Sequence, residues 1–229
     1  MEASEADLAA TRRLQPFDGA GKKTLSRLFA DAVAYDFAAD SALWREGDGP
    51  RYVYVLLSGY VGIKATDAKA NTYLIEMVRP GTLFPLSAVV LNRPYLSYAE
   101  TLGASRILMI PARVFRDCLK ADAPFSFAVN RVLSAQRSEL AQHVKGLKTQ
   151  SPRMRLAEFL LSLTDRTRGE AIIHLPCERQ MIAGWLGVVP SSASRAFRDL
   201  EKSCGIVGRG RQLHVRSVER LARYTDLAA

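Results

Sequence analysis

The chain has 229 residues, of which 48% are hydrophobic and 24% are charged, proportions typical of a globular protein rather than a disordered or fibrous one. No apolar run approaches the roughly 18 residues of a membrane span and no secretory signal is visible, so we expect a cytoplasmic protein without a membrane partner. The formal net charge of +9 is uneven: residues 1–147 contribute +3, and the shorter stretch 148–229 contributes +6. This basic C-terminal part predicts an anionic partner.

One helix and then a β-rich domain are predicted at the start of the chain. Residues 21–34 place Leu25, Leu28 and Phe29 at helical spacing. From residue 35 to about 110, short apolar or alternating runs such as RYVYVLLSGYVGIKA are separated by glycines and by Pro80. We therefore predict a first domain over residues 1–110, built from short strands and turns.

A long helix is predicted over residues 111–148. Its second half repeats a step of four and three residues, at Val129, Leu133, Gln136, Leu140, His143 and Leu147. This heptad spacing is typical of two helices that pair along a seam, in which the polar members set the register. The same stripe would also arise if the helix packed on the chain's own β-rich domain. We favour the pairing, which predicts a homodimer.

A third domain is predicted over residues 149–229. Pro152, after the candidate N-cap Ser151, begins a helix over residues 152–163, and AIIHLP reads as a short strand. Two helices follow at 178–187 and 190–203, separated by a sharp corner at Gly187. A glycine-punctuated hairpin, GIVGRGRQLHV, and a short helix over 217–225 complete the domain.

The corner and its serines indicate a winged helix-turn-helix. In the 190–203 helix the apolar residues fall on one stripe, which leaves serines and arginines on the other faces. In a helix-turn-helix, the start of the second helix contacts base edges in the major groove of DNA. Short serines permit a close approach, Arg195 can reach guanine or a phosphate, and the remaining basic residues are placed for phosphates. The predicted DNA-binding residues are Ser191, Ser192, Ser194, Arg195, Arg198, Lys202, Arg209 and Arg211.

From about residue 20 to its end, the chain resembles the CRP/FNR family of bacterial transcription regulators. The resemblance rests on WREGDGPRYVYVLLSGYVGIKA and VRPGTLF in the first part and on LPCERQMIAGWLGVVPSSASRAFRDLEKSCGIVGRGRQLHV in the last. It implies an α+β fold with a cyclic-nucleotide-binding-type β-roll as sensor domain, a dimerisation helix and a C-terminal winged helix-turn-helix. It also implies a homodimer on a palindromic site in double-stranded DNA. We expect RNA polymerase as a further partner.

The sensor segment departs from the members of the family that bind cyclic AMP. Those members use a glutamate on the ribose and an arginine on the phosphate, and the equivalent positions here are Leu86 and Leu96. A buried phosphate would lack its charge partner, so we predict that cyclic AMP is not the effector. Two interpretations of this segment remain: it forms a pocket for a small apolar effector, or it forms a filled core without a ligand. The candidate pocket residues are Phe84, Leu86, Val89, Leu96, Tyr98 and Gln136.

The cofactor prediction is that none is certain, with haem left open. No cysteine precedes Cys118, which excludes the N-terminal iron–sulfur cluster of FNR-type members. The three histidines, at 143, 174 and 214, lie outside the β-rich domain, so a haem there would need an unusual ligand such as His143. No metal site is predicted. Cys177 is a candidate redox switch, against the alternative of a buried, inert thiol.

These observations favour a DNA-binding regulator over an enzyme. A metal-dependent enzyme on a β-barrel needs histidines or carboxylates converging inside the barrel, and the β-rich domain has no histidine. The alternatives within the family are a haem-dependent regulator that responds to nitric oxide or redox state, and an effector-independent regulator with Cys177 as redox switch. A glutamate that reads a C·G pair in FNR proteins is replaced here by Ser191, so the resemblance implies a different target at that base pair.

Overall fold

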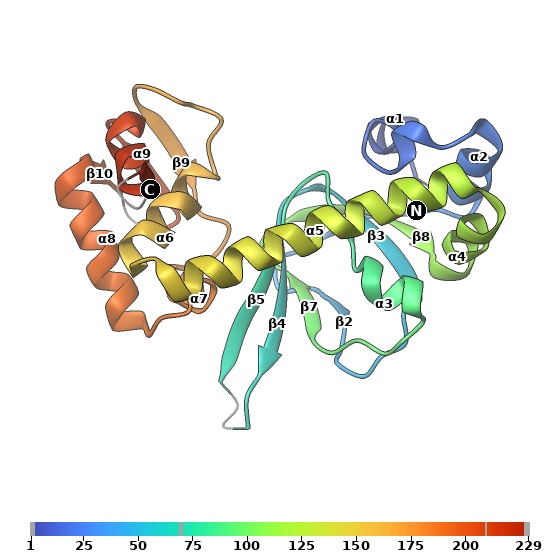
Figure 1. Cartoon of the computed structure of the whole chain (residues 1–229), viewed down its shortest axis with the longest axis horizontal. Helices are drawn as coiled ribbons and strands as arrows, with labels where there is room; N and C mark the ends of the chain where they lie inside the picture. The colour runs from blue at the N-terminus through green and yellow to red at the C-terminus, as the bar shows by residue number, and fades with distance from the viewer. Residues whose placement is uncertain (1–2, 69–70, 209, 227–229) are drawn as a thin grey trace. The chain divides into compact units, whose positions relative to one another are not determined.

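The computed structural model describes residues 3–68, 71–208 and 210–226 of the chain (Figure 1). By its internal contacts the chain divides into two units, one comprising residues 1–66 and 76–139 and the other residues 67–75 and 140–229. We call them the β-roll unit and the C-terminal unit. The division falls inside the long helix, so that helix contributes residues 123–139 to one unit and residues 140–149 to the other.

The β-roll unit contains two four-stranded antiparallel sheets, with strand orders β1-β8-β3-β6 and β2-β7-β4-β5. The strands of the first sheet are β1 (Val33–Phe37), β3 (Tyr52–Ser58), β6 (Leu83–Phe84) and β8 (Ser105–Pro111). Those of the second are β2 (Ala42–Trp44), β4 (Val61–Thr66), β5 (Thr72–Val78) and β7 (Tyr98–Thr101), and residues 72–75 of β5 are counted with the other unit. These strands lie between residues 33 and 111, so the predicted strand-and-turn character of residues 35–110 is confirmed.

Strand β3 contributes side chains to two hydrophobic clusters, one on each face of the first sheet. Successive side chains of a strand point to opposite faces. Tyr54 and Leu56 therefore pack between the two sheets, with Trp44 and Phe84. Val53 and Val55 lie on the other face, in a cluster with residues of the covering helices. A strand buried on both faces reads as the continuous apolar run YVYVLL rather than as an alternation.

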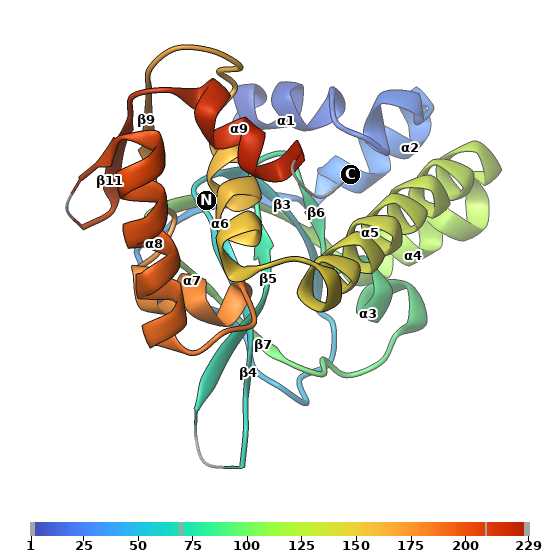
Figure 2. The same ribbon diagram turned by 60° about the vertical axis from the view of Figure 1, so that its left-hand side comes forward.

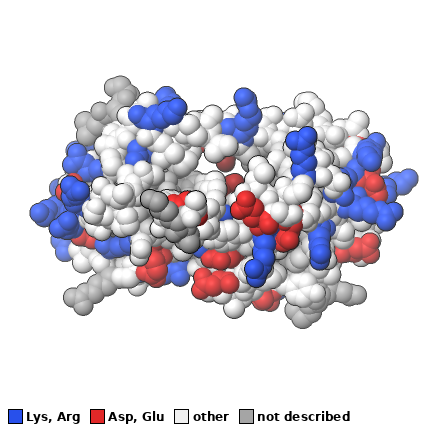
Figure 3. All heavy atoms as spheres, turned by 90° about the horizontal axis from the view of Figure 1, so that it is seen from below, with Lys and Arg blue, Asp and Glu red and all other residues white. Residues whose placement is uncertain are grey.

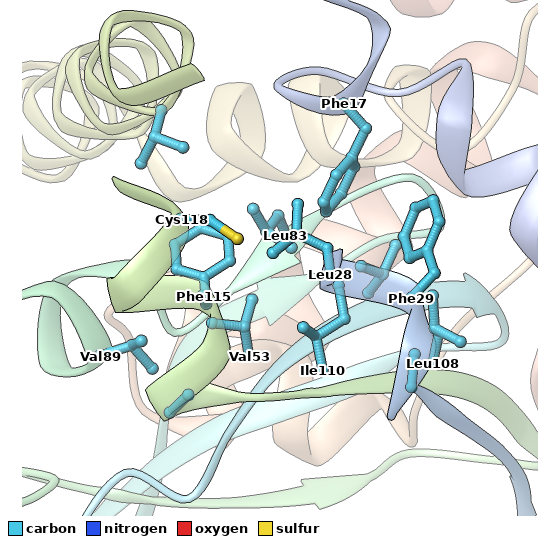
Figure 4. Packing of buried hydrophobic residues seen from close by; sticks show 14 of the residues in the cluster. Phe17, Leu28, Phe29, Val53, Leu83, Val89, Leu108, Ile110, Phe115 and Cys118 are labelled. Carbon is cyan, nitrogen blue, oxygen red and sulfur yellow. The ribbon is translucent and has the colours of Figure 1, made fainter. Parts of the chain in front are cut away.

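Helices cover the outer face of the first sheet. Helix α2 (Lys22–Ala30) contributes Leu28 and Phe29, and α4 (Ala112–Ala121) contributes Phe115 and Cys118 (Figure 4). The remaining helical elements of this unit are α1 (Glu5–Arg12), η1 (Phe17–Gly19), α3 (Leu86–Leu91) and the first half of α5 (Ala123–Thr149). Helix α2 ends earlier than the predicted 21–34, because β1 begins at Val33.

The predicted helix over 111–148 is two helices. The backbone at Asp122 is extended, which ends α4 before α5 begins at Ala123. Early in α5, Val129 is buried and Leu133 packs against the same core, while the Gln136 side chain donates to the Leu83 carbonyl at 2.9 Å. This half of the heptad stripe therefore packs on the chain's own β-roll unit. Further along, Leu140 and Leu147 are exposed.

Beyond the end of α5, the C-terminal unit combines further helices with a three-stranded sheet of order β10-β11-β9. The helices are α6 (Pro152–Leu161), α7 (Arg179–Trp185), α8 (Pro190–Cys204) and α9 (Val218–Asp226), and the strands are β9 (Ala171–His174), β10 (Ile206–Val207) and β11 (Gln212–Val215). Ser151 is confirmed as an N-cap, since its side chain accepts a hydrogen bond from the Met154 amide at 3.3 Å. Figure 2 shows α7 and α8 meeting at their corner, with the strands at the other end of α8.

Candidate nucleic-acid interface

The corner between α7 and α8 has the geometry that the sequence predicted for a helix-turn-helix. Gly187 ends the first helix with φ of 63°, a left-handed conformation that glycine adopts without steric cost. Pro190 occupies the first turn of α8, where its missing amide hydrogen costs nothing. The buried stripe of α8 comprises Ala193, Ala196, Phe197, Leu200 and Cys204. This stripe fixes which face of α8 remains exposed.

The exposed face of α8 carries most of the predicted DNA-binding residues. Arg195, Arg198 and Lys202 are exposed at steps of three and four residues, which place them on one side of the helix. Ser191 and Ser194 are exposed on the first two turns, and Ser192 is half-buried. In Figure 3, Lys and Arg side chains predominate over Asp and Glu at the left-hand end, where Figure 1 places α8. The helix therefore presents short polar groups at its start and positive charge along its length.

The hairpin after α8 has a tight start that requires glycine. A Cβ added at Gly208 would lie 2.2 Å from the Gln212 carbonyl oxygen and 2.9 Å from the Leu213 Cα, so no other residue fits without moving the backbone. Arg211 is half-buried, and its Nε donates to the Leu175 carbonyl at 3.2 Å. Arg209 lies outside the described residues. Arg211 is therefore held against the segment before α7, in addition to the phosphate contact predicted for it.

Arg179 is a residue at this interface that sequence reasoning missed. Its guanidinium lies over the Phe197 ring, 4.6 Å from the centroid, and Nη1 pairs with the Glu201 carboxylate at 3.1 Å. Nη2 also donates to the Gly208 carbonyl at 3.4 Å. One side chain of α7 thus contacts both α8 and the hairpin that follows it. Its partners lie 18 to 29 positions further along the chain, and no local pattern connects them.

The structure does not bring the six predicted effector-pocket residues together. Leu86 and Val89 lie in the cluster beneath the helices, whereas Phe84 lies in the cluster between the sheets. Leu96 is 91% exposed to solvent. Tyr98 is half-buried on β7, and Gln136 is engaged by the Leu83 carbonyl. The stretch 86–91, expected in a strand-and-turn domain, is the short helix α3, which separates the side chains that the prediction had grouped.

Aromatic side chains fill the space between the two sheets. Trp44 stacks on Tyr95 with ring centroids 4.6 Å apart, and Tyr54 stacks on Phe84 at 5.5 Å. The Tyr95 hydroxyl is buried without a hydrogen-bond partner in the described residues. Burial, together with the charge of Asp48, raises the pKa of Tyr95 to about 12. The space between the two sheets is thus filled by a packed aromatic core.

The cysteines and histidines give little support to a redox or metal centre. Cys177 is 3% exposed, which favours the inert thiol over the redox switch. His143 stacks on Trp185, and His214 lies 3.0 Å from the Glu170 carboxylate. Within residues 3–68, 71–208 and 210–226, no group of three or more His, Cys, Asp or Glu side chains could hold a metal ion. None of the helices in the described residues is long and apolar enough to span a membrane.

Two known domain families match two separate parts of the chain. Residues 35–122 match the cyclic nucleotide-binding domain, and residues 154–224 match the Crp-like helix-turn-helix domain. The first match covers the β-roll and α4, and the second covers α6 through most of α9. The order of the two domains is the one that the sequence resemblance implies.

Individual relatives extend the similarity over most of the chain. The transcriptional activator protein Anr of Pseudomonas protegens is 23% identical over 177 residues, covering 76% of this chain and 72% of Anr. A CRP-like cAMP-activated global transcriptional regulator of Mycobacterium tuberculosis is 23% identical over 213 residues, covering 90% of this chain and 94% of the regulator. The crystal structure of a putative cyclic nucleotide binding protein from Ruegeria pomeroyi superposes on this chain with a TM-score of 0.74 at 24% identity. The superposition covers 98% of this chain and 99% of that protein. That structure establishes the fold.

Proposed function

We propose that this chain, which belongs to the CRP/FNR family of transcription regulators, is not an enzyme but acts as a homodimer on a palindromic promoter site in DNA. It is proposed to read that site through α8. The observation that carries this proposal is the exposed face of α8, where Ser191, Ser194 and Arg195 lie opposite a fully apolar stripe. RNA polymerase as a partner and a cytoplasmic location belong to the same proposal.

Arg195 is the residue proposed to read a base. Its position in the second turn of α8 is exposed, and an arginine there reaches guanine O6 and N7 in the major groove with two hydrogen bonds. Ser191 and Ser194 allow the helix to approach closely because their side chains are short. At Ser191 the FNR-type members resembled by this sequence have glutamate, so the base pair read there differs.

Arg198 and Lys202 are proposed to contact phosphates. Both are exposed on α8 beyond the part of the helix that would contact bases. Arg211 and Arg209 are proposed to act in the same way from the hairpin. Contacts of this kind add affinity on every sequence and make it depend on salt.

A salt titration distinguishes the two roles. We expect Arg198→Ala to weaken binding to specific and random DNA by the same factor, and to reduce the slope of log affinity against log salt by about 0.9 for each phosphate that the protein no longer neutralises. Fluorescence anisotropy from low to high salt measures both. The matched control is Arg166→Ala, which removes the same charge from an exposed loop of the same unit. A larger loss on specific than on random DNA for Arg198→Ala would contradict its assignment.

The second half of α5 supplies the proposed dimer contact. Leu140, Val144 and Leu147 are 57%, 42% and 37% exposed and recur at steps of four and three residues. The described chain buries none of them, whereas a partner helix would cover all three. The seam is therefore proposed to run through these residues rather than through Val129 and Gln136, which face the β-roll unit.

A charge placed on this seam should dissociate the dimer. We expect Leu140→Glu to give a monomer by light scattering coupled to size exclusion, because the carboxylate would be buried without a partner at the helix pair. Leu96→Glu, at a residue 91% exposed, is the matched control and should remain dimeric. A Leu140→Glu protein that stays dimeric with an unchanged dissociation constant would refute the seam.

The proposal includes no cyclic AMP site. Leu86, which replaces the ribose-binding glutamate, is 2% exposed in a core, and Leu96, which replaces the phosphate-binding arginine, faces solvent. The packed aromatic core supports a regulator that binds DNA without an effector in the β-roll. Haem fits the residues poorly, since the β-roll unit has no histidine to serve as an axial ligand.

A further inference from the structure

Three contacts hold the end of α5 within the C-terminal unit, two of them to the helix-turn-helix and one to α6. The first is an aromatic stack: the rings of His143 on α5 and Trp185 on α7 have centroids 4.1 Å apart and planes inclined by 22°. Both side chains are half-buried. A ring stack adds directional preference to the burial of apolar area.

The second contact lies one turn further along α5. A Cβ added at Gly187 would lie 2.7 Å from the Leu147 Cδ2, which is too close for a side chain at that position. Leu147 therefore packs directly on the backbone at the corner of the helix-turn-helix. The positive φ of Gly187 independently favours glycine at this position. The corner itself is thus one of the surfaces against which α5 packs.

The third contact fixes the last turn of α5. Nη1 of Arg155, on α6, donates to the carbonyls of Gly146, Leu147 and Gln150 at 3.3, 3.2 and 2.7 Å. Carbonyls at the end of a helix lack partners inside the helix, and a cation there also complements the helix dipole. Arg155 therefore holds the end of α5 against the start of α6.

The stack involves a neutral imidazole ring. Burial lowers the pKa of His143, and the positive charge of Arg155 lowers it further. The ring is therefore uncharged at neutral pH, so a phenyl group in its place should preserve the contact.

Together these contacts hold residues 140–149 in the C-terminal unit. We propose that His143 is a positioning residue, whose stack on Trp185 fixes the angle between the last turns of α5 and the recognition helix α8. In a dimer joined through Leu140, Val144 and Leu147, this angle sets the distance between the two recognition helices. The stack would thereby determine which spacing between half-sites the protein accepts. This inference rests on the proposed dimeric DNA-binding function.

The test measures spacing selectivity with the full-length protein. The probes are the palindrome that the wild-type chain selects from a random pool, and the same half-sites with the spacer lengthened or shortened by one or two base pairs. The quantity measured is the affinity for the selected palindrome divided by the affinity for the probe with the altered spacer. We expect His143→Ala to reduce this ratio about three- to tenfold, which corresponds to the free energy of one aromatic pair. Binding to a single half-site should be unchanged, because α8 itself is untouched. His143→Phe should retain the wild-type ratio.

Trp185→Leu provides the same test from the other ring. The double variant with His143→Ala should lose no more selectivity than either single variant, because both remove the same contact. Thermal unfolding of each variant identifies any that does not fold. If the folded single variants keep the wild-type spacing ratio, or if His143→Phe loses as much as His143→Ala, the inference is wrong. If instead the wild-type chain selects no palindrome, the proposed function fails.

Discussion

Arg195→Ala should cost about 1–3 kcal/mol of binding free energy at one base pair in each half-site, and a dimer that uses two half-sites should lose the sum. The physical reason is the loss of a bidentate donor to guanine, which also leaves that base edge without its partner. Anisotropy titrations on the selected palindrome and on variants at each base pair measure the loss. Affinity for random DNA should fall much less.

Arg195→Lys is a useful companion to this variant. It retains the charge but not the planar pair of donors, so it should recover random-DNA binding without recovering base discrimination. An equal loss on specific and random DNA for Arg195→Ala would show that Arg195 contacts phosphate rather than a base.

Asp7→Asn should lower the free energy of unfolding of the β-roll unit by roughly 2 kcal/mol at neutral pH. Asp7 on α1 is 7% exposed, and its two carboxylate oxygens accept from Nε and Nη2 of Arg106, both at 2.8 Å. The Arg106 guanidinium, together with Ser4, holds the pKa of Asp7 well below its usual range. Urea denaturation of the two proteins at several pH values measures the difference.

The pH dependence has a definite sign. Because the folded-state pKa of Asp7 is depressed, its contribution is present above the unfolded pKa, near 3.9, and is lost as the pH falls toward the folded value. The wild-type and Asp7→Asn proteins should therefore differ by a constant amount above about pH 5 and converge in acid. Asp36→Asn is the matched control, since the exposed Asp36 carboxylate accepts from Nη1 of the same arginine at 2.7 Å and should contribute little. A difference that grows in acid would contradict the assignment.

The C-terminal elements were the most predictable part of the fold. Ser151 before Pro152, Gly187 at the corner and Pro190 after it are local signals, and each marks an element boundary in the structure. Helix α1 also has a local signal, a capping box between Ser4 and Asp7, which sequence reasoning missed. Helix α3 has a weaker one: LSAVVL is short, apolar and compatible with a strand.

The heptad stripe of α5 shows a limit of sequence patterns. An apolar stripe predicts that one face of a helix is buried, but it does not predict whether the residues that bury it come from the same chain or from a partner. Val129 is covered by the chain's own core, whereas Leu140 on the same stripe is exposed. The contacts of Arg179 and His143 were also beyond prediction, because their partners come from elements distant in sequence.

Base reading by α8 is tested most directly by selection of DNA from a random pool, with the purified protein at physiological salt and no ligand added. We predict a palindrome whose half-sites lie about one helical turn apart and whose affinity does not change when cyclic AMP is added. We also predict that Arg195→Ala fails to enrich the same half-site. Weak, salt-sensitive binding to every sequence would contradict base reading, since α8 would then contribute charge without sequence discrimination.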